Sequence, residues 1–284
     1  MGACGGVNAW KRGPERDGLP WMAREGVPRC IGTGGVYTGW TMNIPDTIRE
    51  PSRMAHYANG DLRPAFNLAL EQVILARAPG PAFLLWRNAP AVIVGRNQDP
   101  AAEVDWTEAR RLGVPVFRRR SGGGAVYHDL GTVNFSFILP AEFPVAEALA
   151  RMVGILGLPA AVTERNDVLA GGRKIAGTAQ YLAGGRRLFH GCLLYDTDLA
   201  RLARILRPHP GKLRRHGVAS VRARVANLRE LLGMPLSSGE FFAELRARAA
   251  RTFAGPPAEV PLPWREEAEK LADTPPFREL APAG

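Results

Sequence analysis

The most constraining feature of this chain is a run of three arginines that leads directly into three glycines, Arg118-Arg119-Arg120-Ser121-Gly122-Gly123-Gly124. An apolar, strand-like segment delivers the chain into this run, and another follows it. Glycine tolerates positive φ and lets a ligand approach the bare backbone, whose N–H groups can bind an anion. Arginine adds a planar fork of donors that suits carboxylate and phosphate. The pattern predicts a loop between strands that holds a negatively charged group, although many Gly-rich loops are simple turns.

The familiar phosphate-binding motifs are absent from this region. A G-x-G-x-x-G motif would require glycine where Tyr127 stands. A second glycine-rich segment, Gly172–Gly177, is followed by Thr178-Ala179 rather than by Lys and Ser or Thr. The loop by itself therefore indicates an anion but not which one.

Composition indicates a globular protein, with 46% hydrophobic and 23% charged residues in 284 and no apolar run long enough to span a bilayer. The first thirty residues have no continuous apolar region of a signal peptide. Three cysteines, Cys4, Cys30 and Cys192, are an odd number without C-x-x-C spacing, which argues against a disulfide framework and a zinc site. We expect a cytoplasmic protein that does not enter membranes.

The charge of the chain is strongly positive, at a formal +10, and arginine dominates the 37 basic residues. The segment from Arg207 to Arg229 contains seven basic residues and no acidic one. This asymmetry indicates an anionic ligand or an acidic partner surface. Nucleic acid is disfavoured as the partner, because no recognised binding module or aromatic–basic interleaving is present.

The organisation of the chain predicts three parts: an irregular leader at 1–58, a catalytic domain at 59–254 and a weakly structured tail at 255–284. Internal methionines at 42 and 54 leave the true start of translation open. Hydrophobic periodicity predicts helices over 66–76, 101–112, 145–156, 198–206 and 238–253. It predicts strands over 83–86, 91–94, 114–118, 132–139, 167–170, 173–181 and 186–195, with 132–139 half-buried and the last three forming an antiparallel meander. This order predicts an α+β fold, a mixed or antiparallel sheet with packed helices.

A second candidate feature is Lys174, the one lysine between Lys11 and Lys212. Strand alternation places it on one face with Ala176 and Thr178. Strand lysines are usually solvated surface residues. The small residues at 176–179 nevertheless leave room for a ligand beside the ammonium, so we interpret Lys174 as functional.

The ordered motifs of the chain resemble those of lipoate–protein ligases in the biotin/lipoate ligase superfamily, over roughly residues 60–250. The matching segments are 66–69, 85–88, 94–100, 119–129, 166–167, 173–179, 189–194 and 217–228. The resemblance implies the catalytic-domain fold of that superfamily. It also implies an ATP-dependent ligase that joins lipoate to AMP and then passes the lipoyl group to a lysine of a lipoyl domain. Biotin ligase is disfavoured, since the run Gly-Arg-Gly-Arg-x-Gly-Arg-x-Trp is missing.

The resemblance also implies roles for individual residues. Lys174 would be catalytic, contacting the lipoyl carboxyl oxygen and the α-phosphate, where it stabilises developing charge. The residues implied to bind ATP and lipoate are Arg119, Ser121, Gly122, Gly123, Gly124, Ala125, Val126, Tyr127, Asn166, Asp167 and Lys174. Asp167 would contact Mg²⁺. Val126 and Ile175 would supply an apolar slot for the acyl chain, and the basic segment 207–224 would cover the adenylate. Alternation along the strand that leads into the loop separates Arg119 from Arg118 and Arg120, which we expect to face solvent.

The partners implied are apo lipoyl domains of 2-oxoacid dehydrogenase complexes or the glycine cleavage H protein. Family ligases commonly carry a further C-terminal domain, and about thirty residues follow Phe253 here, so a separately encoded accessory subunit is a further implied partner. Cys192 stands where ligases usually have Thr or Ser. Because related transferases place their cysteine nucleophile before the lysine motif, where this chain has Asn166-Asp167, we interpret Cys192 as a structural thiol.

Three alternatives stay open at this point. The first is the ligase, the second a lipoyl or octanoyl transferase that acts without adenylation, and the third a non-catalytic basic binding protein. The choice between lipoate and octanoate, the lipoyl domain that is served and the oligomeric state are also open.

Overall fold

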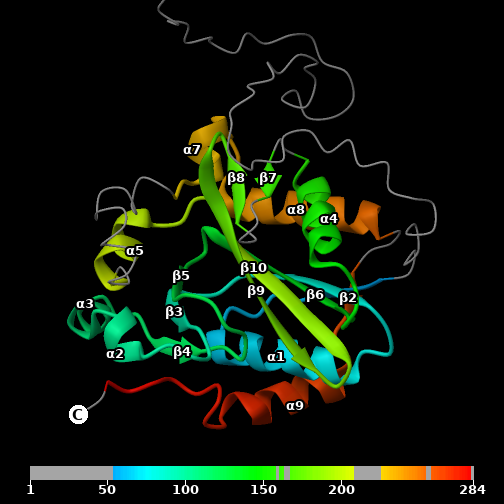
Figure 1. Cartoon of the computed structure of the whole chain (residues 1–284), viewed down its shortest axis with the longest axis horizontal. Helices are drawn as coiled ribbons and strands as arrows, with labels where there is room; N and C mark the ends of the chain where they lie inside the picture. Colours follow the sequence, from blue (N-terminus) through cyan, green and yellow to red (C-terminus); the bar gives the residue numbers. More distant parts are fainter. Residues whose placement is uncertain (1–53, 158–159, 163–166, 208–224, 254–256, 283–284) are drawn as a thin grey trace, which may run out of the picture. The chain divides into compact units, whose positions relative to one another are not determined.

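Two β-sheets organise the residues that the computed structural model describes, which are 54–157, 160–162, 167–207, 225–253 and 257–282 (Figure 1). The elements follow in the order β1 (Ala55–Ala58), α1 (Pro64–Arg77), β2 (Ala82–Trp86), β3 (Ala91–Val94), α2 (Pro100–Glu103), α3 (Trp106–Arg111), β4 (Val116–Arg118), β5 (Val126–His128), β6 (Thr132–Pro140), α4 (Val145–Leu156), β7 (Ala161–Val162), β8 (Val168–Ala170), β9 (Arg173–Ala183), β10 (Arg186–Leu194), α5 (Leu199–Ile205), α7 (Leu228–Leu232), α8 (Ser238–Thr252), β11 (Ala258–Glu259) and α9 (Leu262–Ala272).

The larger sheet has the strand order β11-β1-β2-β6-β10-β9-β8-β7, and the smaller has the order β4-β3-β5. Strand β1 is parallel to β11 and β2, and β3 is parallel to β4. The other pairs are antiparallel, including the meander β8-β9-β10. The prediction of an α+β fold with a mixed sheet is confirmed. Strands β2 and β3 are neighbours in sequence but belong to different sheets.

Helices lie on both faces of the larger sheet. Figure 1 shows α1 and α9 on one side of it and α4 and α8 on the other. On the first side, α1 packs on Leu84, Ile138 and Leu188. On the second, the Phe83 ring packs at a tilt against Phe137 and against Phe253 at the end of α8. Covering both faces buries the first eight residues of β6, so the prediction that this strand is half-buried was wrong.

The first helix is stabilised at both of its ends. It begins with Pro64 in its first turn, where a missing N–H costs nothing. At its other end, Arg186 of β10 donates to the carbonyl oxygens of Leu75, Ala78 and Gly80. A helix leaves its last carbonyls without internal partners, and a cation is favourable there. Arg186 therefore fixes α1 to the sheet.

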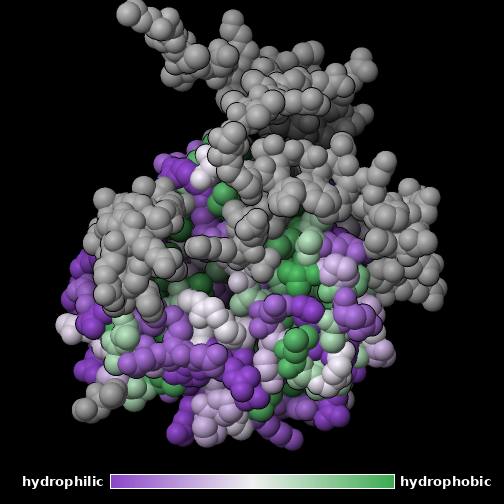
Figure 2. All heavy atoms as spheres, viewed as in Figure 1, coloured by the Kyte–Doolittle hydropathy of each residue, from purple (hydrophilic) through white to green (hydrophobic). Residues whose placement is uncertain are grey.

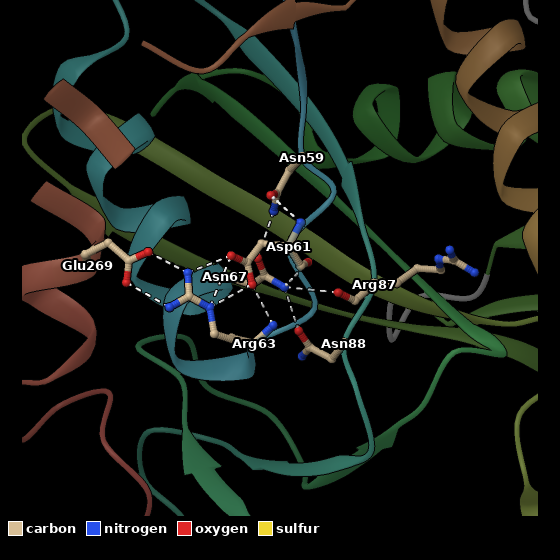
Figure 3. A network of polar contacts seen from close by, with 7 residues as sticks. All are labelled: Asn59, Asp61, Arg63, Asn67, Arg87, Asn88 and Glu269. Atoms are coloured by element: carbon tan, nitrogen blue, oxygen red, sulfur yellow. Dashed lines mark hydrogen bonds and ion pairs between the residues drawn. The ribbon is translucent and has the colours of Figure 1, made fainter. Parts of the chain in front are cut away.

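A buried asparagine anchors the start of α1 (Figure 3). Asn67 is completely buried, and its amide nitrogen donates to the carbonyl oxygens of Asp61 and Arg87 and to Oδ1 of Asn88. Its Oδ1 accepts from Asn59 at 2.8 Å. These bonds tie the chain before α1 to the turn after β2, which satisfies polar groups that would otherwise be costly to bury.

The segment predicted as a weakly structured tail contains regular structure within its described residues, 257–282, namely β11 and helix α9. Helix α9 packs on α1, and Ala268, Ala272 and Phe277 belong to the main core. Two exposed ion pairs, Arg63–Glu269 and Arg77–Glu267, join the helices at the surface. Figure 2 shows hydrophilic residues dominating the surface around α9 in this view. The high content of Pro and Glu obscured this helix, whose narrow apolar stripe is stabilised by tertiary contact.

Two other boundaries differ from expectation. Strand β1 lies inside the segment predicted as a leader, and it pairs with β2 and β11; residues 1–53 are outside the described part of the chain. The helix predicted over 101–112 is divided into α2 and α3 at Val104 and Asp105. Val104 forms a β-bridge with Leu206, and the Asp105 carboxylate caps α3 by accepting from the Glu108 N–H. Contact with the chain after α5 and a good N-cap thus override the continuous helical pattern.

Candidate functional site

The glycine loop is organised from beneath by Arg119. This side chain is 7% exposed, and its Nη2 donates to the carbonyl oxygens of Gly122 and Gly124 at 2.6 and 2.7 Å. Its Nη1 donates to the Ile93 carbonyl of β3 at 3.0 Å. Burial lowers the pKa of the guanidinium to about 10, which leaves it a cation at neutral pH. Both terminal nitrogens of Arg119 therefore donate to the protein backbone.

This arrangement sets the direction of the loop amides. In a planar trans peptide, a carbonyl and the following N–H point in opposite directions. With the carbonyls of Gly122 and Gly124 turned toward Arg119, the N–H groups of Gly123 and Ala125 point away from it. Among the described residues no hydrogen bond uses these two N–H groups as donors. Gly123 has φ of +85°, which glycine adopts without strain. The loop thus presents free amides of the kind that bind anions.

A second loop, residues 95–98, supports the first. Arg118 donates from Nη1 to the carbonyl oxygens of Gly95, Arg96 and Gln98 at 2.9, 3.0 and 2.8 Å. The Arg96 N–H donates to the Ser121 carbonyl at 2.8 Å. The expectation that Arg118 faces solvent was wrong, because a guanidinium fork suits a cluster of loop carbonyls.

The third arginine of the run behaves as expected. Arg120 is exposed, and it contacts Tyr181 of β9 through a hydrogen bond to the hydroxyl and over the ring.

A β-bulge aims Lys174. Val168 lies opposite Ala176, and Leu169 lies opposite Lys174, so one step along β8 spans two along β9. Residues three apart on a regular strand point to opposite faces. Here, however, a Cβ on Gly177 would lie 3.2 Å from Nζ of Lys174. The ammonium lies beside Gly177, and the expectation that it shares a face with Ala176 and Thr178 was wrong because the bulge reverses the alternation.

An ion pair completes the position of this lysine. Nζ of Lys174 lies 2.7 Å from Oδ1 of Asp167, and both side chains are about one-third exposed, at 35% and 31%. The backbone of Lys174 is also fixed, since its carbonyl accepts from the Ala226 N–H at 3.0 Å. The Lys174 ammonium and the Asp167 carboxylate are both accessible and neutralise each other. Such a pair suits a site in which the ammonium can meet an anionic ligand and the carboxylate can meet a cation.

Strand β9 brings the two features together. A Cβ on Gly123 would lie 3.8 Å from the Ala179 side chain, so the glycine loop sits over β9. Lys174 lies beside Gly177, two residues earlier on that strand. Cys192 of β10 lies opposite Gly177, and the charges of both Lys174 and Arg119 act on its thiol. The structure therefore places the loop and Lys174 around one region of the sheet.

The thiol of Cys192 is not prepared for nucleophilic attack. The residue is buried and free, and burial raises the pKa of its thiol, a shift that Lys174 and Arg119 only partly oppose. The reactive form of cysteine is the thiolate, which a raised pKa disfavours. This agrees with the interpretation of Cys192 as a structural residue.

The remaining predicted site residues divide into three groups. Val126 and Tyr127 are in β5, where Val126 is half-buried and the Tyr127 side chain is buried in a core cluster with Val92 and Val94 of β3. Ile175 has no exposed surface. Asn166 and the basic residues 208–224 lie outside the described residues. Within the described ranges, no three His, Cys, Asp or Glu side chains cluster as metal ligands.

Sequence reasoning gave no role to Glu71 and His190. Glu71 lies in the middle of α1 and His190 in β10, and a hydrogen bond of 2.9 Å joins them. His190 also contacts Ser121 of the glycine loop at 2.6 Å. A buried glutamate in an apolar helical pattern is the one signal in the sequence that could have drawn attention to this connection.

In the part of the chain that the structure describes, no helix is long and apolar enough to cross a membrane.

Comparison with known proteins places this geometry in a family. Residues 63–250 match the family model of the lipoyl protein ligase A/B catalytic domain. Lipoate–protein ligase 1 of Staphylococcus aureus is 39% identical over 187 residues, which are 63% of this chain and 57% of that protein. The chain thus spans little more than half the length of this curated relative.

Solved structures agree. A structure of a bi-partite lipoate protein ligase and its E2 lipoyl domain from Thermoplasma acidophilum superposes with a TM-score of 0.64 and 28% identity, covering 79% of this chain and 95% of that one. A lipoate-protein ligase A bound with ATP also has a TM-score of 0.64, with 26% identity over 78% of this chain and 94% of that one.

Proposed function

This chain belongs to the family of lipoyl protein ligase A/B catalytic domains, and we propose that it is an ATP-dependent lipoate–protein ligase. In the first half-reaction a lipoate carboxylate oxygen attacks the α-phosphorus of ATP, and pyrophosphate leaves. In the second, the amine of a lysine in a lipoyl domain attacks the acyl carbonyl of lipoyl-AMP, and AMP leaves. The observation that supports this most is the position of the Lys174 ammonium beside the β9 segment covered by the glycine loop.

The glycine loop is proposed to bind the phosphates. Its free N–H groups at Gly123 and Ala125 are fixed donors, and such donors stabilise charge without reorganising during the reaction. Arg119 contributes by holding the loop, and Ser121, Gly122, Gly124, Val126 and Tyr127 form the rest of this segment. ATP is present in a relative of 26% identity, which supports a nucleotide site in this fold.

Lys174 is proposed to act in both half-reactions. The first step brings two anions together, and an ammonium between the carboxylate and the α-phosphate reduces their repulsion. In the second step the same ammonium polarises the acyl carbonyl toward the incoming amine. In the structure the ammonium of Lys174 pairs with Asp167 at 2.7 Å. Binding of an anionic substrate would replace the Asp167 carboxylate with the substrate as the partner of this ammonium.

Asp167 is proposed to contact Mg²⁺ together with the phosphates of ATP. Magnesium in nucleotide sites is commonly bound by one or two carboxylates plus substrate phosphates and water. The Asp167 carboxylate, which is about one-third exposed beside Lys174, fits that pattern. Asn166 is proposed to help hold the adenylate, and Val126 to border the acyl chain.

The acceptor is proposed to be an apo lipoyl domain, as in a 2-oxoacid dehydrogenase complex or the glycine cleavage H protein. The archaeal relative was described with its E2 lipoyl domain and as a bi-partite ligase. An accessory subunit is therefore a further proposed partner. Transfer without adenylation is disfavoured by the raised pKa of Cys192.

The test is an acylation assay on purified protein with lipoate, Mg-ATP and an apo lipoyl domain, read by intact mass, alone and with a candidate accessory subunit. We expect acylation that requires ATP, survives Cys192→Ser and is lost in Lys174→Ala. Lys174→Arg is the matched variant that keeps the charge. Acylation from an octanoyl carrier without ATP, abolished by Cys192→Ser, would overturn the proposal, as would no acylation in either setting.

A further inference from the structure

A continuous chain of buried hydrogen bonds runs from helix α1 to the glycine loop. Oε1 of Glu71 lies 2.9 Å from Nδ1 of His190, and Nε2 of His190 lies 2.6 Å from Oγ of Ser121. Oγ of Ser121 in turn accepts from Nε of Arg119 at 3.0 Å. All four residues are buried, with Glu71 and Ser121 each 1% exposed. Elements more than a hundred residues apart in the sequence thus meet in one polar path.

The direction of each bond in this chain follows from the donor and acceptor chemistry of its members when the His190 ring is neutral. A carboxylate can only accept, so Nδ1 of His190 carries a proton and donates to Glu71. In the neutral ring Nε2 is then an acceptor, and it receives the Ser121 hydroxyl proton. The Ser121 oxygen is left to accept from Arg119, whose N–H groups can only donate. Every member therefore has its partner, which is the condition for a stable buried network.

The two ends of the chain carry opposite charges. Arg119 is a buried cation and Glu71 a buried carboxylate, and the charge of Glu71 favours the ionised form of Arg119. An unpaired buried charge is expensive, and removing one partner of such a pair leaves the other uncompensated. Arg119 must stay fixed and charged to hold the carbonyls of Gly122 and Gly124. Its distant partner therefore affects the loop.

We propose that Glu71 is a positioning residue for the glycine loop, acting through His190, Ser121 and Arg119 to keep the loop carbonyls turned inward and its amides free. The order Ser121–His190–Glu71 is also that of a nucleophile, its base and an orienting acid. Here the Ser121 oxygen is buried and engaged by Arg119, so the set acts in structure and not in attack on a substrate. The effect on ATP rests on the proposed function; the effect on the loop does not.

The experiment uses the full chain labelled with ¹⁵N-glycine. The heteronuclear NOE of the Gly122, Gly123 and Gly124 amides reports fast loop motion, and calorimetric titration with Mg-ATP reports affinity. The variants are Glu71→Gln, which keeps the shape and removes the charge, Ser121→Ala, which breaks the chain, and the double variant. Ser136→Ala is the matched control, since Ser136 donates to the same Oε1 atom from outside the path to the loop.

In Glu71→Gln we expect lower NOE values at the three glycines and an ATP affinity reduced at least about threefold. The change should be much smaller when Ser121→Ala is already present, because coupled residues are non-additive. Ser136→Ala should leave both readouts near wild type.

Three outcomes would overturn the inference: unchanged glycine NOE values in Glu71→Gln, an equal effect in Ser136→Ala, or full additivity with Ser121→Ala. A rise in the KM for lipoate without a change in loop motion would mean that Glu71 lies against the acyl chain. If wild-type glycine resonances do not respond to ATP, the proposed function fails separately from this inference.

Discussion

A side chain at Gly95 would collide with Gly123, because a Cβ there would lie 2.1 Å from the Gly123 carbonyl oxygen. The two glycines belong to separate loops that touch backbone to backbone. Arg118 holds the loop at 95–98 and Arg119 holds the glycine loop, so neighbouring arginines organise two adjoining pieces of one site. The position of each loop depends on the other.

Gly95→Ala should therefore displace the glycine loop. Backbone atoms have no flexible end that can move aside, and we expect a loss of about 1–3 kcal/mol in the free energy of unfolding, as for overpacking, together with weaker ATP binding. Urea unfolding and titration with Mg-ATP measure both. Gly60→Ala is the control, since no heavy atom lies within 4 Å of a Cβ there. Wild-type ATP affinity in Gly95→Ala would contradict the prediction.

Cys192→Ala should retain ATP-dependent acylation. The thiol is buried with a raised pKa, so it contributes volume and not nucleophilicity. The rate of lipoyl transfer to an apo lipoyl domain, followed by intact mass, gives the answer. A folded variant, judged by circular dichroism, that no longer acylates would show that the thiol participates in the reaction.

His56→Leu should make the free energy of unfolding depend less on pH below neutral pH. Burial, reinforced by the charge of Arg246, lowers the pKa of His56 from 6.5 to about 4. Between pH 6.5 and about pH 4, His56 is protonated in the unfolded chain and neutral in the folded chain. The free energy of unfolding that this residue contributes at neutral pH is therefore lost as the pH falls toward 4. The leucine variant should avoid a loss of about 1 kcal/mol between about pH 6 and pH 5.

Urea unfolding of wild type and His56→Leu at several pH values checks this. The free energy of unfolding of the variant should still fall somewhat with decreasing pH, because the pKa of the buried His128 is also lowered, to about 3. Parallel profiles for the two proteins would show that His56 does not titrate on unfolding in this range.

The tail after residue 255 should stabilise the protein through apolar contact and not through its ion pairs. Phe277 is in the main core, and Phe277→Ala should lower the free energy of unfolding by about 3–5 kcal/mol. Glu269→Ala removes an exposed partner of Arg63 and should change it by less than about 1 kcal/mol. Chemical denaturation of both variants tests the contrast, and equal small effects would mean that the tail is dispensable.

Local patterns predicted most of the elements. Helices near 66–76, 145–156, 198–206 and 238–253 and the β8-β9-β10 meander agree with the structure. The α+β fold and the ligase family are confirmed. The roles of individual site residues stay predictions. The misses share one cause, namely contact with a distant segment: α9 is stabilised by α1, β6 is covered on both faces, and the helix at 101–112 is interrupted by the chain after α5.

The sequence by itself identified the glycine loop and the strand lysine Lys174 as candidate anion-binding features. It could do so because the chemistry of a residue and the local periodicity are both properties of neighbouring positions in the chain. The tertiary structure decided which face Lys174 uses, through a bulge that needs β8 as a partner. It also decided what the arginines do, since Arg118 and Arg119 turn inward to loop carbonyls that only folding brings within reach. Strand register and the burial of a charge depend on partners distant in sequence, which a local pattern does not encode.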